Sequence, residues 1–183
     1  MAKGEASCNE IIAGNTVEET VYHEAGHIVA ACALGLPLRP KGIIVYEVGD
    51  GVGDGYACYG EDEQPPEAVF MALLAGVKAQ RTEFPGSWIG GATSDESKMR
   101  KIAEVHFQGR WHEVLDRLSP QVDELLREYW GAVAAVAESL LGAAWEPLEI
   151  GEDPNNKAKR KRQLPGDSLL SILKQHGILT HVA

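Results

Sequence analysis

The pentapeptide His23-Glu24-Ala25-Gly26-His27 constrains this chain more than any other feature of its sequence. If the segment is helical, two histidines four residues apart lie on one face, about one turn apart. Two imidazoles at that spacing can bind one Zn²⁺ ion at about 2.0–2.1 Å. Glu24 then lies beside the metal without having to bind it, where it can accept a proton from a water molecule that the metal acidifies. The pattern therefore predicts a zinc site with a base beside it.

The residues around this motif predict that it lies inside a helix. Thr16 and Glu19 have the spacing of a capping box, in which the threonine caps the helix and the glutamate reaches back to it. Gly35, followed by Pro37, is typical of a helix end, so we expect a helix from Thr16 to about Leu34. The composition of the chain gives about 0.02 accidental matches to the motif, too few to treat it as coincidence.

The remaining sequence predicts a mainly α fold, a helical domain with one small β-hairpin. Two β-prone runs flank a glycine-rich loop and predict the hairpin, at residues 42–46 and 56–59. Start signals and apolar spacing predict further helices, at 65–77, at 93–106, from Ser119 onward and at 167–177. Residues 153–165 are polar, basic and bounded by prolines, which favours a loop or a disordered insert.

A zinc site also needs a third protein ligand, and the sequence offers several. The candidates are the acidic residues and the other histidines, namely His106, His112, His176 and His181. His106 and His112 are six residues apart and would lie on opposite faces of a helix, so they do not form a second pair. Asp95 follows Gly91-Ala92-Thr93-Ser94 at an expected helix start, although the helix dipole alone also favours an acid in a first turn.

Together these segments resemble the proteolytic domain of the FtsH-type ATP-dependent zinc metalloproteases. The segments that carry the resemblance are His23 to His27 followed by Val29-Ala30, then Leu74-Ala75-Gly76, then Gly91 to Asp95. More loosely, the likeness extends from about Thr16 to Leu141. It implies that His23, His27 and Asp95 bind zinc and that Glu24 is the catalytic base.

Two departures from the family pattern stand out. The family usually carries an arginine and later a glutamate where this chain has Val77-Lys78-Ala79-Gln80, and an apolar residue where it has Glu96. We expect these changes to affect packing and subunit contacts more than zinc binding. No GxxxxGK[ST] phosphate loop occurs and no membrane span precedes the domain, so we expect neither ATP hydrolysis nor unfolding work from this chain.

Composition and the resemblance together suggest how the chain is organised and where it works. The expected parts are an N-terminal tail (1–15), an FtsH-peptidase-like zinc metalloprotease domain (16–150), a basic loop or linker (151–166) and a C-terminal helix packing on that domain (167–183). The net charge of −10 argues against nucleic-acid binding. The absence of a signal peptide, a membrane span or a CxxC pair favours the cytoplasm.

The expected function is that of a zinc-dependent metalloendopeptidase, which hydrolyses peptide bonds of unfolded or flexible proteins through metal-activated water. Its expected partner is a polypeptide substrate, which can add as a strand to the hairpin, and neither nucleic acid nor membrane. A separate unfoldase or ATPase and a homo-oligomer are left open. The main alternative is a non-catalytic zinc-binding regulatory or adaptor module that keeps the peptidase fold. A weaker alternative is a nucleic-acid adaptor that acts through Lys157 to Arg162.

Overall fold

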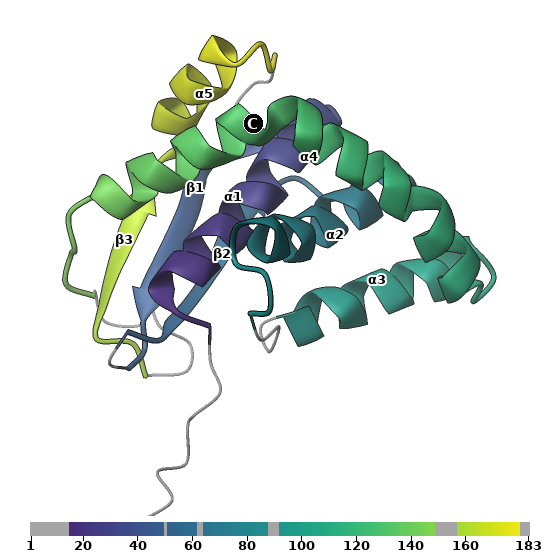
Figure 1. The fold of residues 1–183 in the computed structure, drawn as a ribbon, viewed down its shortest axis with the longest axis horizontal. Coiled ribbons are helices and arrows are strands. Elements are labelled where there is room, and N and C mark those ends of the chain that lie inside the picture. The colour runs from purple at the N-terminus through teal and green to yellow at the C-terminus, as the bar shows by residue number, and fades with distance from the viewer. Residues whose placement is uncertain (1–14, 50, 62–63, 88–91, 149–156, 180–183) are drawn as a thin grey trace, which may run out of the picture.

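The structure, a computed structural model, describes residues 15–49, 51–61, 64–87, 92–148 and 157–179 (Figure 1). In chain order its elements are α1 (Val17–Ala33), β1 (Leu38–Glu47), β2 (Gly53–Tyr59), α2 (Pro66–Glu83), α3 (Ala92–His106), α4 (Trp111–Gly142), β3 (Arg160–Leu164) and α5 (Gly166–Gln175). The fold is mainly helical, as expected, and its strands form one small antiparallel sheet. None of the helices in these ranges has both the length and the apolar character that crossing a bilayer requires.

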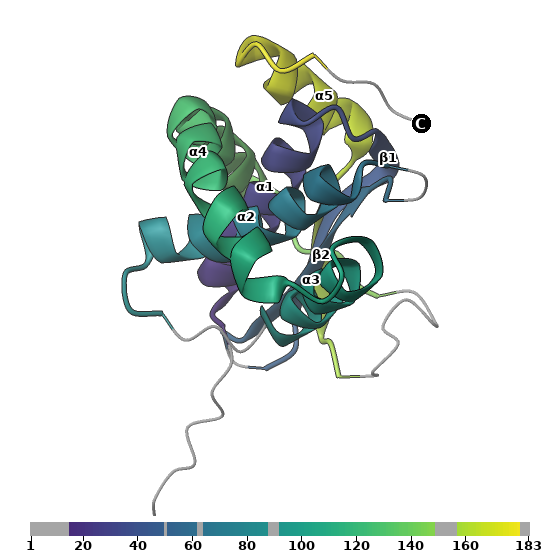
Figure 2. The ribbon, with the colours of Figure 1, turned by 90° about the vertical axis from the view of Figure 1, so that its right-hand side faces the viewer.

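Helix α1 is the central element of the fold. It packs against the sheet on one side and against α2 and α4 on the other (Figure 2). Most of its residues are buried, as is typical of a helix with neighbours all round. The predicted capping box is confirmed, because the backbone N–H of Glu19 donates to Thr16 Oγ1 at 3.1 Å and that of Thr16 donates to Glu19 Oε2 at 2.7 Å.

A glycine lets α1 and α2 approach each other closely. A Cβ atom at Gly26 would lie 2.5 Å from the Cβ of Ala79 and 2.8 Å from the carbonyl oxygen of Ala75. Contacts of that length do not occur between real Cβ atoms and their neighbours. The small residues of both helices therefore fix how near α2 lies to the two histidines of α1.

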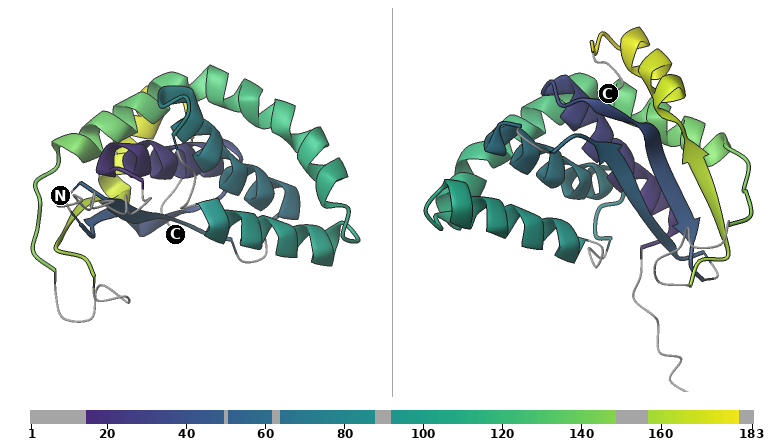
Figure 3. Two further views of the ribbon diagram at one scale, coloured as in Figure 1. Left: turned by 60° about the horizontal axis from the view of Figure 1, so that its bottom comes forward. Right: turned by 180° about the vertical axis from the view of Figure 1, so that it is seen from behind.

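The predicted hairpin is confirmed, but it belongs to a larger sheet than expected. The strand order is β2-β1-β3, and both neighbours run antiparallel to β1. Ile43 at the centre of β1 pairs with Ala57 on one side and with Leu164 on the other. Figure 3, in its view from behind, shows the three strands side by side. The expectation of a two-stranded hairpin is therefore corrected to a three-stranded sheet.

The expectation that residues 153–165, or the segment 151–166, form a loop or linker is wrong for residues 160–164. These residues form β3, which pairs with the second edge of β1. Residues 151–156 lie outside the described part of the chain. A basic composition predicted solvent exposure, but the backbone groups of a strand can pair with β1 whatever the side chains carry.

Two cations of this basic strand are buried rather than solvated. Lys161 and Arg162 are each 8% exposed. The guanidinium of Arg162 donates to the carbonyl oxygens of Leu140 and Leu141 at the end of α4, and its carbon lies 3.8 Å from the ring centroid of Trp145. A cation at a helix C-terminus is favoured by the helix dipole, and an arginine stem packs well on an indole ring.

The long helix starts earlier than the sequence predicted. We expected it to begin at Ser119, before Pro120, whereas α4 begins at Trp111 and carries the proline inside it. The first turns are held by tertiary contacts, because Val114 and Leu118 are buried. These contacts outweigh the usual preference of proline for a helix start. The final helix, α5, contacts β1 and α4 and lies close to its predicted position.

Helix α3 is attached to the rest of the fold by one narrow face. Of its described side chains, Asp95, Met99 and Ala103 are buried, and they recur every four residues. This face packs mainly on α2, with fewer contacts to α4 (Figure 1). The first of these three buried residues is the predicted third ligand.

Candidate metal centre

Two imidazoles of α1 point toward one place in the interior. His23 and His27 are each 5% exposed, and their Nε2 atoms lie 2.9 Å apart. Their rings are nearly perpendicular, with centroids 4.5 Å apart. The spacing of four residues therefore produces the shared face that the sequence predicted.

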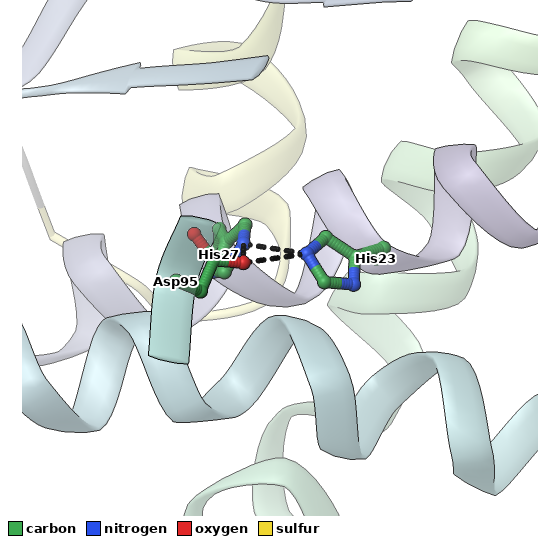
Figure 4. Close-up of side chains that lie close together, drawn as sticks. All are labelled: His23, His27 and Asp95. Carbon is green, nitrogen blue, oxygen red and sulfur yellow. Dashed lines mark hydrogen bonds and ion pairs between the residues drawn. The ribbon is translucent and has the colours of Figure 1, made fainter. Parts of the chain in front are cut away.

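The carboxylate of Asp95 meets both imidazoles. Its Oδ2 atom lies 2.9 Å from His23 Nε2 and 3.1 Å from His27 Nε2 (Figure 4). Burial raises the pKa of Asp95, but the hydrogen bonds and charge of the two histidines, when protonated, outweigh it and hold this pKa well below its ordinary value. Among the described residues, these three side chains form a buried cluster that can bind a metal ion.

The other histidines do not join this cluster. His106, His112 and His176 lie within the described residues, and none of them belongs to the group of potential ligands. His181 lies outside the described residues. The structure thus brings together the set that the family resemblance implied, with an aspartate as the third member.

The second nitrogen of each imidazole is fixed by an acceptor on α2. His27 Nδ1 lies 2.8 Å from the carbonyl oxygen of Ala72, which can only accept, so Nδ1 carries the proton. His23 Nδ1 lies 3.1 Å from Gln80 Oε1. Both Nε2 atoms of the neutral rings therefore present lone pairs toward Asp95, as is common for histidines that bind metals.

This arrangement of acceptors fits a bound cation. Two imidazole nitrogens and a carboxylate oxygen face one another at 2.9–3.1 Å, and without a proton or metal between them these lone pairs repel. Ligand atoms around tetrahedral Zn²⁺, with bonds of about 2.0–2.1 Å, lie about 3.3 Å apart. The observed separations are close to that value, so the residues fit a small tetrahedral metal ion.

The role of Gln80 was missed at the sequence level. Its amide is fully buried and its Nε2 donates to Asn15 Oδ1 at 3.1 Å and to Ser87 Oγ at 3.3 Å, which turns Oε1 toward His23. We expected the departures from the family pattern at this position to affect packing and subunit contacts more than zinc binding, and the structure adds that one of them, Gln80, contacts a candidate ligand. The available signal was its spacing of four from Gly76, which puts an amide on the helix face that meets α1.

Glu24 lies next to the cluster but is not part of it. The side chain is 6% exposed. Burial raises the pKa of Glu24 to about 7, against the lowering effects of His23 and of a hydrogen bond from the backbone N–H of Ala57. The negative charges of Asp95 and Asp54 raise this pKa further. A carboxyl group with a pKa near neutrality can both accept and return a proton.

A cavity of about 150 Å³ opens beside the cluster. Its wall includes His23, Glu24, His27 and Asp95 together with much of β2. Tyr59 also lines it, and burial, helped by nearby carboxylates, raises the pKa of its phenol, so the hydroxyl stays neutral. This tyrosine was not predicted as a site residue, because nothing local distinguishes it from other strand aromatics.

No protein-family model and no curated protein matches this chain. The resemblance to FtsH-type peptidases therefore rests on the motifs quoted above.

Proposed function

We propose that this chain is a zinc-dependent metalloendopeptidase that hydrolyses peptide bonds in unfolded or flexible polypeptides. The observation that supports this most is the position of Glu24, a buried carboxylate in the same cavity as a three-residue ligand cluster. Structural zinc sites are usually closed by four protein ligands, whereas catalytic sites have three and leave one position open. A purely structural site would also have no use for a base beside it.

The donor set favours zinc among the common metals. Two imidazole nitrogens and one carboxylate oxygen are ligands that Zn²⁺ accepts readily, while Ca²⁺ and Mg²⁺ prefer oxygen alone. When bound, Zn²⁺ supplies Lewis acidity, which polarises a substrate carbonyl and lowers the pKa of a water molecule. His23, His27 and Asp95 would hold the ion, and Gln80 and the carbonyl of Ala72 would orient the two rings.

The proton transfers of the reaction are carried out by a residue of the chain. Glu24 accepts a proton from the attacking water and then donates it to the amine that leaves. The backbone N–H of Ala57 hydrogen-bonds the Glu24 carboxylate and holds it at the cavity wall. Because Glu24 is buried, few water molecules compete for its carboxylate.

The substrate would bind along β2. In the order β2-β1-β3, one side of β2 has no strand beside it in the described part of the chain, and this strand lines the cavity. Near its start that side is used by Asn15, whose carbonyl accepts from Gly53. Beyond Gly53 an extended polypeptide can add as a further strand, with its carbonyl groups close to the cluster. Only an unfolded or flexible segment can adopt this conformation.

Replacing the proposed base tests this function. Glu24→Gln keeps the shape of the side chain and removes its basicity, so the variant should bind one zinc ion and fold normally. Its hydrolysis of casein should fall by about 10²–10⁴-fold, the usual effect of losing a general base. Glu18→Gln, an exposed change in the same helix, is the matched control and should hydrolyse casein like wild type.

Two results would contradict the proposal. Equal casein hydrolysis by wild type and Glu24→Gln would point to a contaminating protease or to a different base. No hydrolysis by zinc-loaded wild type would favour the non-catalytic zinc-binding module.

A further inference from the structure

A second cavity, next to α3, adjoins the cavity beside the metal cluster. This second cavity has a volume of about 360 Å³. Glu61, Leu73 and Lys98 line both cavities, so the two are neighbours and a polypeptide bound in the first is close enough to place a side chain in the second.

The second cavity has an apolar floor. Leu73 of α2 is 1% exposed, and Ile102 and Val105 of α3 complete the surface. Val105 is 64% exposed, one of the few large apolar side chains among the described residues with so much of its surface in solvent. Because nothing in the described fold covers this side chain, an apolar group of a bound molecule would gain free energy by covering it.

The rim of the second cavity is basic. Lys98, Lys101 and His106 stand around it on α3 and are exposed. Glu61 lies opposite and pairs with Lys98 at 3.7 Å, which offsets only part of the positive charge. Two lysines against one carboxylate leave this rim positively charged, which favours an acidic group on the molecule that binds there.

We propose that the second cavity is a specificity subsite of the cleft, which accepts an apolar side chain flanking the scissile bond and, beside it, an acidic side chain. This inference rests on the proposed peptidase function and names the class of substrate. The apolar side chain covers Leu73, Ile102 and Val105, and the acidic one lies near Lys98 and Lys101. A basic side chain at the second position would be repelled.

Peptide binding to zinc-loaded Glu24→Gln tests the subsite without requiring catalysis. Labelled peptides that differ at two adjacent positions, Leu-Asp, Leu-Lys and Ser-Asp, are compared by fluorescence anisotropy. We expect Leu-Asp to bind about tenfold more tightly than either of the others, since exposed ion pairs and a small apolar contact each contribute modestly. Added salt should reduce the difference between Leu-Asp and Leu-Lys.

Charge reversal on the rim gives the sharper result. Lys101→Glu in the same background should favour Leu-Lys over Leu-Asp, and Val105→Asp should reduce the preference for leucine over serine. Lys174→Glu makes the same change of charge at an exposed position of α5, a helix that lies far from α3 in Figures 1 and 2, and should leave the order unchanged. An unchanged order of peptides in Lys101→Glu would overturn the proposal.

Hydrolysis of the same peptides by wild type separates this inference from the proposed function. Cleavage of all three at equal rates would overturn the subsite and leave the peptidase standing. The binding preference without any cleavage would keep the subsite and overturn the peptidase.

Discussion

The imidazole of His27 lies directly against the backbone of Gly76. A Cβ atom at residue 76 would lie 2.5 Å from His27 Nε2 and 2.7 Å from Nδ1, which no real side chain could tolerate. This glycine of α2 therefore leaves space for the imidazole ring of His27. In that space the Nδ1 atom of His27 donates to the carbonyl oxygen of Ala72, which lies one turn before Gly76 in α2. The position of a candidate ligand on α1 thus depends on the absence of a side chain on α2.

Gly76→Ala should weaken zinc binding by at least about tenfold. The new methyl group forces His27 to move, and metal–ligand distances tolerate only about 0.2 Å of error. Elsewhere in a helix, replacing glycine with alanine stabilises the folded protein by about 0.5–1 kcal/mol. Gly142→Ala, where a Cβ would meet nothing within 4 Å, is the control. Zinc affinity is measured by competition with a chelator, and an unchanged value in Gly76→Ala would show that the ring is not confined by α2.

Gln80→Leu should also weaken zinc binding, by about 10–100-fold, because His23 loses the acceptor for its Nδ1–H. Gln80→Glu should retain most of the affinity, since a carboxylate also accepts from Nδ1 and Asn15 can turn its amide to donate. Gln121→Leu removes an exposed amide of α4 and serves as the control. Equal zinc affinity in the leucine and glutamate variants would mean that Gln80 fills space without orienting His23.

Asp95→Ala should abolish casein hydrolysis and strongly reduce zinc affinity. Removing a hydrogen-bond partner of a metal ligand lowers metal affinity by about 10–100-fold, and removing a ligand itself should lower it by more. The helix should remain, because a first-turn acid contributes only about 0.3–1 kcal/mol through the helix dipole. Circular dichroism measures the helix content, and metal analysis measures the bound zinc. Glu96→Ala, the exposed neighbour, is the control. Full activity of Asp95→Ala would place the third ligand elsewhere.

Arg162→Ala should lower the free energy of unfolding by about 2–4 kcal/mol, because it removes a cation–π contact and takes the guanidinium donor away from the carbonyl oxygens of Leu140 and Leu141 at the end of α4. Deleting residues 157–162 should lower the free energy of unfolding further, since it removes three of the five residues of β3. The exposed substitution Lys174→Ala is the control, and denaturant melts supply the measurement. Unchanged stability after the deletion would restore the view of this segment as a solvated loop.

Where the signals were local, the sequence was sufficient. Thr16 and Glu19 lie within one turn of each other, so their capping box and the helix it starts could be predicted from spacing alone. The shared face of His23 and His27 follows from the helix period in the same way. Asp95 could be named only through the family resemblance, because 68 residues separate it from His27.

Local sequence patterns did not predict the contacts between segments that are distant in the chain. Arg160 of β3 pairs with Glu47 of β1 across 113 residues, and no local pattern encodes that partnership. The burial of Arg162 depends on Trp145 and on the end of α4, so composition alone predicted a solvated loop. Gln80 looked like a departure from a family pattern until its contact with His23 was visible.

Because α3 is attached to the fold by one narrow face, a bound metal ion would also act as a reversible cross-link between α3 and the rest of the protein. Asp95 begins the buried face of α3, and a metal ion shared with His23 and His27 would tie this helix to α1. Ligand binding to the native state alone adds about 4 kcal/mol at a thousandfold excess over Kd. Chelation should therefore release α3 first, and its amide hydrogens should exchange with solvent before those of α1, whose neighbours surround it.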